Sequence, residues 1–284
     1  MMKKYLILGK GWIGSRIHKC LRADISESKI YGLKDVVNAI EKYEPEVIIN
    51  AIGKTGFPNV DWCETHKQET LFGNVTVPLL LAEACETEGI QLVHIGTGCI
   101  YDNFSSNKQV YYVDRYFSEK DTPNFFGSYY SRTKYYVEQL LKEFKVLQLR
   151  IRMPFDVYEH QKNLFSKLTK YDKLIELSNS MTYIPMFIEA LDHLIHADAT
   201  GIYNIVCNGG ITHPELMDLY EKIMNKEVHY DVITIKELHE VTQAKRSNCL
   251  LSPTKLEKSG FKVLDIYDAV QDGLKKYKSN VESQ

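Results

Sequence analysis

Two side chains that could perform acid–base chemistry, Tyr130 and Lys134, stand four residues apart in the middle of the chain. Residues at this spacing lie one turn apart on the same face of a helix. The apolar residues that follow recur at helical spacing: Val137, Leu140, Leu141 and Phe144. A lysine ammonium beside a tyrosine favours the phenolate and lowers a pKa that is normally about 10. Such a phenol could exchange a proton with a carbonyl or an alcohol. A solvated helix surface is the alternative interpretation.

Composition excludes several classes of function. The 284 residues are 44% hydrophobic and 25% charged, which is ordinary for a soluble globular protein. A net charge of −2 predicts neither a nucleic-acid nor an anionic membrane partner. No signal peptide or membrane-spanning apolar run is recognisable, so we expect a cytoplasmic protein. The six cysteines and nine histidines show no metal-ligand spacing, and we expect reduced thiols and no metal.

A glycine-rich loop near the start predicts dinucleotide binding. The apolar run 5–8 is followed by Gly9-Lys10-Gly11-Trp12-Ile13-Gly14, after which apolar residues continue at helical spacing. Strand, glycine loop and helix in this order allow a pyrophosphate to approach the backbone N–H groups of the helix N-terminus. We predict that this loop binds the cofactor, together with two small residues, Ala51 at the end of the next buried strand and Gly53 just beyond it.

The type of dinucleotide is less clear from the residues. An acidic residue about 20 positions after the loop would bind the ribose of NAD, but residues 23–32 contain no apolar run closed by Asp or Glu. Lys10 and Arg16 could instead contact a 2′-phosphate. This pattern favours NADPH, with NADH as the alternative cofactor.

The remaining elements of the first half alternate between helix and strand. Strands are predicted at 47–51, 92–95 and 146–151, and helices at 36–43 and 79–85. This order is typical of an α/β fold with a doubly wound, Rossmann-type parallel sheet, in which ligands bind at the carboxyl ends of the strands. Gly9, Gly53 and Thr97 all fall at such ends.

The second half has a looser pattern. Helices are predicted at 164–171, 186–196 and 266–274, the last followed by a polar tail, with a strand at 202–206 and a helix capped by Thr212. We expect an NADP-binding domain at 1–154 and a smaller, mainly substrate-binding lobe at 155–284. The chain is expected to cross between them, with the site in the cleft.

Several longer strings carry a family resemblance: Gly11-Trp12-Ile13-Gly14, Pro58-Asn59-Val60-Asp61-Trp62-Cys63-Glu64, Thr97-Gly98-Cys99-Ile100, Asp121-Thr122-Pro123-Asn124-Phe125, Arg150-Ile151-Arg152-Met153-Pro154, Asn179-Ser180-Met181-Thr182 and Arg246-Ser247-Asn248. Together with Tyr130 and Lys134, they make the chain resemble the extended short-chain dehydrogenase/reductases. Within these it is similar to the plant-type enzymes that 3,5-epimerise and 4-reduce UDP-4-keto-6-deoxyglucose to UDP-rhamnose, which are related to dTDP-4-dehydrorhamnose reductases. The glycine loop is one residue shorter than is usual in these relatives, and the stretch after Thr182 is abbreviated.

This resemblance implies an NADPH-dependent enzyme and a set of catalytic residues. Thr97 and Tyr130 would donate hydrogen bonds to the C4 oxygen of the sugar, and Tyr130 would supply the proton during reduction. Lys134 would lower the pKa of Tyr130 and hold the nicotinamide ribose. Cys99 and Lys167 would be the acid/base pair of the epimerisation.

The predicted substrate contacts are Asn59, Asp61, Asn74, Thr97, Asn163 and Arg246. Arg246 suits a diphosphate, whereas Asn74 either faces the site or caps a helix. The resemblance further implies a UDP-sugar supplied by a nucleotide-sugar 4,6-dehydratase, and a homodimer. Two alternatives stay open, a monofunctional dTDP-4-dehydrorhamnose reductase and a dinucleotide-binding regulatory subunit without turnover.

Overall fold

The computed structural model describes residues 3–105, 110–111 and 115–283. Contacts divide the chain into two compact units, each made of three stretches. The first unit contains Met1–Ile100, Phe125–Arg150 and Leu194–Tyr203, and the second contains Tyr101–Asn124, Ile151–His193 and Asn204–Gln284. Residues 194–203, which the sequence prediction assigns to the substrate lobe, belong to the first unit because they lead into a strand of its sheet.

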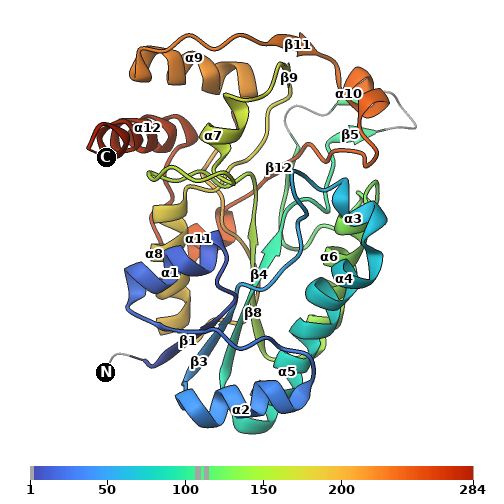
Figure 1. The fold of residues 1–284 in the computed structure, drawn as a ribbon, viewed down its shortest axis with the longest axis vertical. Coiled ribbons are helices and arrows are strands. Elements are labelled where there is room, and N and C mark those ends of the chain that lie inside the picture. Colours follow the sequence, from blue (N-terminus) through green and yellow to red (C-terminus); the bar gives the residue numbers. More distant parts are fainter. Residues whose placement is uncertain (1–2, 106–109, 112–114, 284) are drawn as a thin grey trace. The chain divides into compact units, whose positions relative to one another are not determined.

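The first unit alternates strands and helices (Figure 1). Its elements are β1 (Tyr5–Leu8), α1 (Trp12–Leu21), β2 (Asp24–Ser26), α2 (Leu33–Tyr43), β3 (Val47–Asn50), α3 (Trp62–Thr65), α4 (Lys67–Leu71), the π-helical η1 (Phe72–Thr76), α5 (Val77–Glu88), β4 (Gln91–Thr97), α6 (Tyr129–Leu140), η2 (Leu141–Glu143), β8 (Val146–Ile151) and β10 (Gly201–Asn204). Among the described residues, six strands form one sheet in the order β10-β8-β4-β3-β1-β2. β2, β1, β3 and β4 pair in parallel, which confirms the predicted Rossmann-type fold class.

The apolar runs of the sequence form the central strands because both faces of the sheet are covered. All four residues of β1 and of β3 are buried. Apolar residues of α2, α5 and α6 pack with Leu6, Ile48 and Leu92 on one face of the sheet, while α1 lies on the opposite side (Figure 1). The carboxyl ends of the parallel strands therefore share one edge, where Gly9 and Thr97 lie.

The short strand β2 is absent from the sequence prediction. Its three residues are polar or partly exposed, yet they pair with β1 so that Ser26 lies opposite Leu8. At the edge of a sheet a strand needs a partner on only one side and no long apolar run. Hydrogen bonding to β1, rather than hydrophobic pattern, therefore defines this element.

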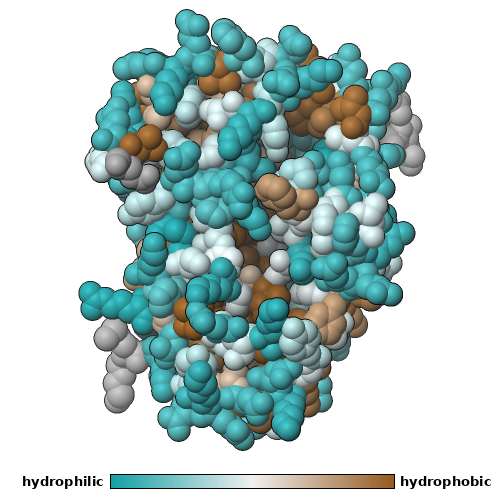
Figure 2. Space-filling model, viewed as in Figure 1, coloured by the Kyte–Doolittle hydropathy of each residue, from teal (hydrophilic) through white to brown (hydrophobic). Residues whose placement is uncertain are grey.

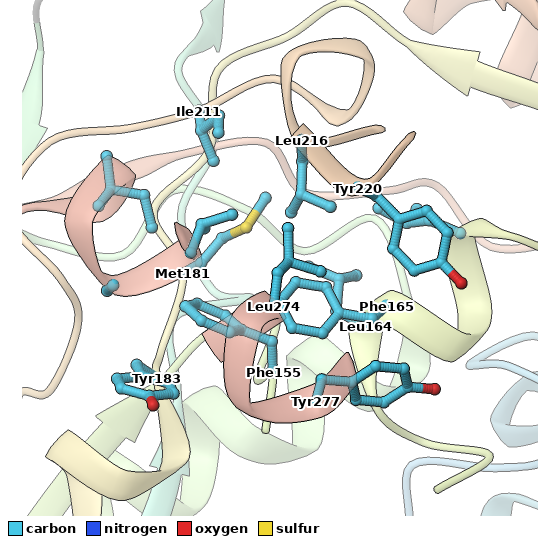
Figure 3. Packing of buried hydrophobic residues seen from close by; sticks show 14 of the residues in the cluster. Phe155, Leu164, Phe165, Met181, Tyr183, Ile211, Leu216, Tyr220, Leu274 and Tyr277 are labelled. Atoms are coloured by element: carbon cyan, nitrogen blue, oxygen red, sulfur yellow. The ribbon is translucent and has the colours of Figure 1, made fainter. Parts of the chain in front are cut away.

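The second unit carries its own core. Its elements are β5 (Phe104–Ser105), β6 (Val110–Tyr111), β7 (Tyr116–Phe117), α7 (Leu164–Leu168), β9 (Lys173–Ile175), α8 (Ile184–His196, of which the last three residues belong to the first unit), α9 (His213–Met224), β11 (Asp231–Ile233), α10 (Ile235–Val241), β12 (Leu250–Leu251), α11 (Thr254–Lys258) and α12 (Ile266–Glu282). Figure 3 shows rings of Phe155, Phe165 and Tyr277 packed with Leu216 and Leu274 in this core. The core joins α7 to α9 and α12.

Two predicted helix ends are wrong. α12 continues to Glu282 instead of ending near 274, because Tyr277 extends its buried stripe and keeps the helix packed on the core. α7 ends at Leu168 rather than at 171, and the next residues form a turn. Both errors arise because packing, not local pattern, decides how far an amphipathic helix continues.

Three of the strings that carry the resemblance meet in one buried polar cluster of the second unit. The Arg152 guanidinium donates to Asn179 Oδ1 at 2.5 Å and to the Ser247 carbonyl at 2.6 Å. Ser247 Oγ donates in turn to the Tyr101 carbonyl at 2.6 Å. Arg152 and Asn179 are at most 1% exposed. Since buried polar groups require partners, these residues hold loops together.

The face shown in Figure 2 is mainly hydrophilic, with hydrophobic side chains in small separate areas. Among the described residues, no helix combines the length and the hydropathy that crossing a bilayer requires.

Candidate functional site

Two glycines of the predicted cofactor loop are required by packing within the first unit. Gly9 has φ of +111°, and a Cβ placed there would lie 2.6 Å from the Ala51 carbonyl carbon. A Cβ at Gly14 would lie 2.0 Å from the Gly9 carbonyl oxygen. Only glycine therefore allows β1, its loop and α1 to approach the end of β3 this closely. Ala51 packs under the loop, so its small side chain supports the predicted cofactor site.

Gly11 differs from its two neighbours. Among the described residues, nothing lies within 4 Å of a Cβ placed there, and its backbone conformation is one that any residue adopts. Gly11 is the N-cap of the ten-residue α1, whose first turn carries no acidic residue. A bare backbone beside open space at a helix N-terminus fits a pyrophosphate, which the helix dipole would stabilise. The loop is thus suited to a dinucleotide.

These contacts predict that alanine at position 14 affects mainly folding stability, whereas alanine at position 11 affects mainly cofactor binding. Gly14→Ala should lower the free energy of unfolding by about 1–3 kcal/mol because its methyl group overlaps the backbone. Gly11→Ala should change it by less than about 0.5 kcal/mol but weaken NADPH binding at least about tenfold by obstructing the phosphates. Urea unfolding and fluorescence titration with NADPH measure both quantities. Unimpaired NADPH binding by Gly11→Ala would place the phosphates elsewhere.

Glu27, directly after β2, is an acidic residue close to where an NAD-binding fold has one, although no apolar run in the sequence marked it. Because Leu8 lies opposite Ser26, Glu27 stands beside the start of the glycine loop. The Lys10 ammonium donates to Glu27 Oε1 in an ion pair. This contact holds the pKa of the Glu27 carboxyl below its ordinary value. Lys10, which we expected to contact a 2′-phosphate, is therefore shared with a carboxylate placed where NAD-binding folds hold a ribose.

Tyr130 and Lys134 both lie on α6, as predicted, and neither is a surface residue. They are 8% and 6% exposed. α6 begins at Tyr129 because the Ser128 hydroxyl accepts the Ser131 N–H as an N-cap. The helix is anchored to the sheet through Glu138, which accepts two hydrogen bonds from Arg150 of β8, at 2.7 and 2.8 Å. The solvated-surface interpretation of the pair is therefore wrong.

The Lys134 ammonium is directed at β4 of the sheet. Lys134 Nζ donates to the Ile95 carbonyl at 3.1 Å and lies 3.2 Å from His94 Nε2. Burial lowers the pKa of Lys134 to about 8, although nearby Glu138 opposes the change. A lysine with this pKa changes its charge close to neutral pH. Thr97 follows Ile95 by two residues in β4, so this contact brings the amine of Lys134 to the part of the strand that carries Thr97.

Thr97 ends β4 and shapes the loop that carries Cys99. Thr97 Oγ1 accepts the Cys99 N–H at 3.1 Å, which closes a tight turn. Since the hydroxyl acts there as an acceptor, its own hydrogen can be donated to another oxygen. Cys99 is a partly exposed reduced cysteine, whereas Cys63 and Cys85 of the same unit are buried. The loop thus presents a hydroxyl donor and an accessible thiol at the carboxyl edge of the sheet.

Asn74 braces the structure rather than capping a helix, so that alternative is wrong. It lies within η1 and is 1% exposed. Its Oδ1 accepts the Lys54 N–H at 2.7 Å, and its two N–H groups donate to the Lys54 carbonyl and to Thr133 Oγ1. Both donors are consumed in tying the loop after β3 to α6. For the predicted contact with substrate, the Asn74 side chain therefore offers only the remaining lone pair of Oδ1, as an acceptor.

The other predicted residues of the first unit lie in the loop after β3. Gly53 is exposed, and a Cβ there would meet Asn74 Oδ1 at 3.6 Å. Asn59 Oδ1 accepts the Asp61 N–H at 2.8 Å, which forms the turn before α3. Both Asn59 and Asp61 are partly exposed. Their predicted contacts with sugar hydroxyls stay predictions.

The structure gives Asn163 of the second unit a structural role, and its predicted substrate contact stays a prediction. Asn163 is fully buried and is the N-cap of α7. Its two N–H groups donate to the carbonyls of Asp156 and Tyr158, both at 2.8 Å. The side chain has no donor left for a sugar and instead positions α7. In the sequence, Asn before an apolar run was already the signature of such a cap.

Two predicted residues of the second unit are accessible. Lys167 lies on α7 and is partly exposed. Arg246, between α10 and β12, donates to the Ala244 carbonyl at 2.6 Å and is also partly exposed. Its guanidinium lies near Tyr171 and counteracts the rise in the Tyr171 pKa that burial causes. The roles of Lys167 in epimerisation and of Arg246 at the diphosphate stay predictions.

The chain is similar to known proteins over most of its length. The family model described as "RmlD substrate binding domain" matches residues 13–279. A bifunctional dTDP-4-dehydrorhamnose 3,5-epimerase/dTDP-4-dehydrorhamnose reductase of Arabidopsis thaliana is 36% identical over 261 residues, which are 89% of this chain and 86% of the relative.

Solved structures show the same fold. The L780 UDP-rhamnose synthase of Acanthamoeba polyphaga mimivirus matches with a TM-score of 0.89 and 30% identity, covering 97% of this chain and 100% of that one. The dTDP-4-dehydrorhamnose reductase of Bacillus anthracis, solved with NADP, has a TM-score of 0.82 and 20% identity, covering 98% and 99% of the two chains. The second likeness concerns the fold alone.

Proposed function

Because the chain belongs to the family of the RmlD substrate binding domain, we propose that it is an enzyme that reduces a nucleotide-linked 4-keto-6-deoxysugar with NADPH. More specifically, it would convert UDP-4-keto-6-deoxy-D-glucose to UDP-L-rhamnose by 3,5-epimerisation followed by 4-keto reduction. The observation that carries the proposal is the buried Tyr130–Lys134 pair. Its lysine bonds to the Ile95 carbonyl of β4, two residues before Thr97 and four before Cys99.

The reduction needs an acid at the C4 oxygen. NADPH, when bound at the Gly9–Gly14 loop, supplies a hydride to C4. Tyr130 then gives its phenolic proton to the C4 oxygen, so that the ketone becomes an alcohol. Thr97 donates its hydroxyl hydrogen to the same oxygen and stabilises the negative charge that develops there. Lys134, one helical turn away, lowers the pKa of Tyr130.

Epimerisation uses the same oxygen in a different way. The C4 ketone makes the hydrogens on C3 and C5 acidic, because the resulting carbanion is delocalised onto that oxygen as an enolate. Cys99 and Lys167 are the proposed groups that remove a proton from one face of the carbon and return one to the other. The exposure of Cys99, in contrast to the buried Cys63 and Cys85, supports this role.

A turnover experiment tests the proposal and separates the alternatives. The protein is incubated in deuterated water with UDP-4-keto-6-deoxyglucose and either NADPH or NADH. Incorporation of deuterium at C3 and C5 and loss of nicotinamide absorbance are then followed. Both signals support the bifunctional enzyme. Reduction only of an already epimerised dTDP-4-keto-rhamnose would indicate the monofunctional reductase, and binding without turnover the regulatory subunit. Matched UDP and dTDP substrates decide the nucleotide, on which the named relatives differ.

The Lys10–Glu27 pair predicts how the cofactor preference responds to substitution. Glu27→Gln should raise the ratio of kcat/KM for NADPH to that for NADH about tenfold, because it frees Lys10 for the 2′-phosphate. Lys10→Met should shift the ratio toward NADH, since Glu27 remains to bind the ribose. Lys19→Met removes an exposed charge from α1, the helix that follows the glycine loop, and serves as the control. Because the pair is exposed, both effects should weaken at high salt.

Substrate supply and assembly remain proposals. A 4-keto-6-deoxysugar must come from a nucleotide-sugar 4,6-dehydratase, since its ketone and its methyl group arise together in such a reaction. The predicted homodimer through α6 is supported by exposed apolar side chains on α4 and α6, Leu71, Tyr136 and Leu140.

A further inference from the structure

His94 of β4 is buried between a strand and the catalytic helix of the first unit. It is 1% exposed. β3 and β4 pair in parallel with Asn50 opposite His94, so both side chains leave the same face of the sheet. Asn50 Nδ2 lies 3.1 Å from His94 Nδ1, and Lys134 Nζ lies 3.2 Å from His94 Nε2. One imidazole thus connects Asn50 to Lys134.

The orientation of the Asn50 amide is determined by a backbone contact. The Ile52 N–H donates to Asn50 Oδ1 at 3.0 Å. A flipped amide would set two N–H groups against each other at this position, so Asn50 must present Nδ2 to the imidazole. Nδ2 is only a donor, and His94 Nδ1 is consequently the acceptor.

The tautomer of His94 follows from this contact. Burial, and then the nearby Lys134, keep the pKa of His94 well below its ordinary value, so the ring is neutral. A neutral imidazole has one N–H and one acceptor. With Nδ1 accepting from Asn50, the proton lies on Nε2 and points at Lys134 Nζ. Such an N–H can bond only to a lone pair, which the neutral amine of Lys134 has and its ammonium lacks.

We propose that His94, held in this tautomer by Asn50, is a positioning residue that stabilises the neutral amine of Lys134 and lets Lys134 release a proton during reduction. This role rests on the proposed function. As Tyr130 gives its proton to the C4 oxygen, the Lys134 ammonium gives one to Tyr130. The phenol is thereby restored and the amine left behind accepts the His94 N–H. Water later returns a proton to Lys134, so charge and protons balance.

Other charges around Lys134 do not account for this preference. Titratable groups on the elements around Lys134 include Tyr130, Arg132 and Glu138 on α6, His94 on β4, Arg150 on β8, Glu64 on α3 and Glu69 on α4, and of these Glu138 is the charge that acts on the Lys134 pKa. Glu138 raises the pKa of Lys134 but is itself engaged by Arg150. Glu64 accepts the Tyr129 N–H, and Glu69 pairs with Lys54 at 3.6 Å. Burial and the His94 N–H therefore favour the amine.

Nuclear magnetic resonance tests the proposal without any substrate. In ¹⁵N-labelled protein, His94 should show the Nε2–H tautomer at neutral pH. In protein with ¹³C,¹⁵N-lysine, the Lys134 signals are identified by their loss in Lys134→Met and should titrate near pH 8. An Nδ1–H tautomer in His94, or an ordinary lysine midpoint, would overturn the proposal. Because neither measurement needs turnover, it can stand or fall separately from the proposed activity.

A double-mutant cycle isolates the contribution of the imidazole. Asn50→Asp keeps the acceptor for the Ile52 N–H but replaces Nδ2 by an oxygen, which should move the His94 proton to Nδ1 and make Nε2 an acceptor. The Lys134 midpoint should then rise by about one pH unit or more. In a His94→Leu background, the same substitution should raise it only by the effect of its added charge. Equal shifts in both backgrounds would mean that His94 plays no part.

The activity readout distinguishes positioning from mere support of the fold. The rate should fall as pH rises through the Lys134 pKa, because the ammonium that supplies the proton is lost. In Asn50→Asp this alkaline limb of kcat should move upward with the lysine midpoint. His213, a partly exposed histidine whose pKa desolvation lowers to about 4, lies in the other unit. His213→Gln is the matched control and should leave the limb and the midpoint in place. The proposal would also be overturned if the alkaline limb of the kcat profile did not move with the titration midpoint of Lys134.

Discussion

Tyr130→Phe is expected to lower the rate of keto-sugar reduction by about 10²–10⁴-fold, the range that a positioned general acid contributes. The substitution removes the phenolic proton but keeps the ring, which is 8% exposed and packed at the start of α6. Deuterium exchange at C3 and C5 should slow as well. Both half-reactions need a hydrogen-bond donor on the C4 oxygen while negative charge develops there.

The measurement compares nicotinamide oxidation and deuterium incorporation in the same sample. Tyr129→Phe, the identical substitution one residue earlier, is the matched control and should retain both activities. NADPH affinity should be little changed in Tyr130→Phe, so the loss should appear in kcat. Exchange at the wild-type rate would mean that Tyr130 serves only the hydride step and that Thr97 alone holds the enolate oxygen.

The second large effect is expected from the proposed epimerisation pair. Cys99→Ala and Lys167→Ala should each lower deuterium incorporation at one or both carbons by about 10²–10⁴-fold. Reduction of a nucleotide-linked 4-keto-rhamnose, which is already epimerised, should continue in both variants. Such a separation is expected because the hydride step needs Tyr130 and Thr97 but no base at C3 or C5.

Matched controls are available for both substitutions. Cys20→Ala removes an exposed thiol from α1, and Lys170→Ala removes an exposed ammonium just beyond α7. Neither should affect exchange. If the Cys99→Ala and Lys167→Ala variants convert UDP-4-keto-6-deoxyglucose at the wild-type rate, the proposed bifunctional activity is contradicted. The monofunctional reductase then becomes the better proposal. Loss of exchange at only one carbon in each variant would assign the two residues to different positions.

Local patterns were sufficient to predict the frame of the first unit. The run 5–8, the glycines after it and the helical spacing that follows each report a short stretch of chain. Their structure depends mainly on neighbours within that stretch. The helix of Tyr130 and Lys134 was predictable for the same reason. The requirement for glycine at positions 9 and 14 can likewise be traced to one close approach of backbone.

The roles of individual polar residues were less predictable. Asn74 and Asn163 were expected at the substrate, but each spends both of its N–H groups on protein oxygens. An asparagine that braces a loop and one that binds a sugar have the same appearance in a sequence. Burial and hydrogen-bond partners distinguish them, and both are properties of the folded chain.

The sequence of this protein therefore specifies its fold class, its glycine loop and the helix that carries Tyr130 and Lys134, because each of these depends on periodicity and glycine placement over a few turns. Tertiary structure decides which groups surround them. The register of β1 with β2 brings Glu27 to Lys10, and the register of β3 with β4 sets Asn50 beside His94 under Lys134. These partners are 17, 44 and 40 residues apart. Only strand pairing and burial bring them together, and burial is also what lowers the pKa of Lys134 toward neutral pH.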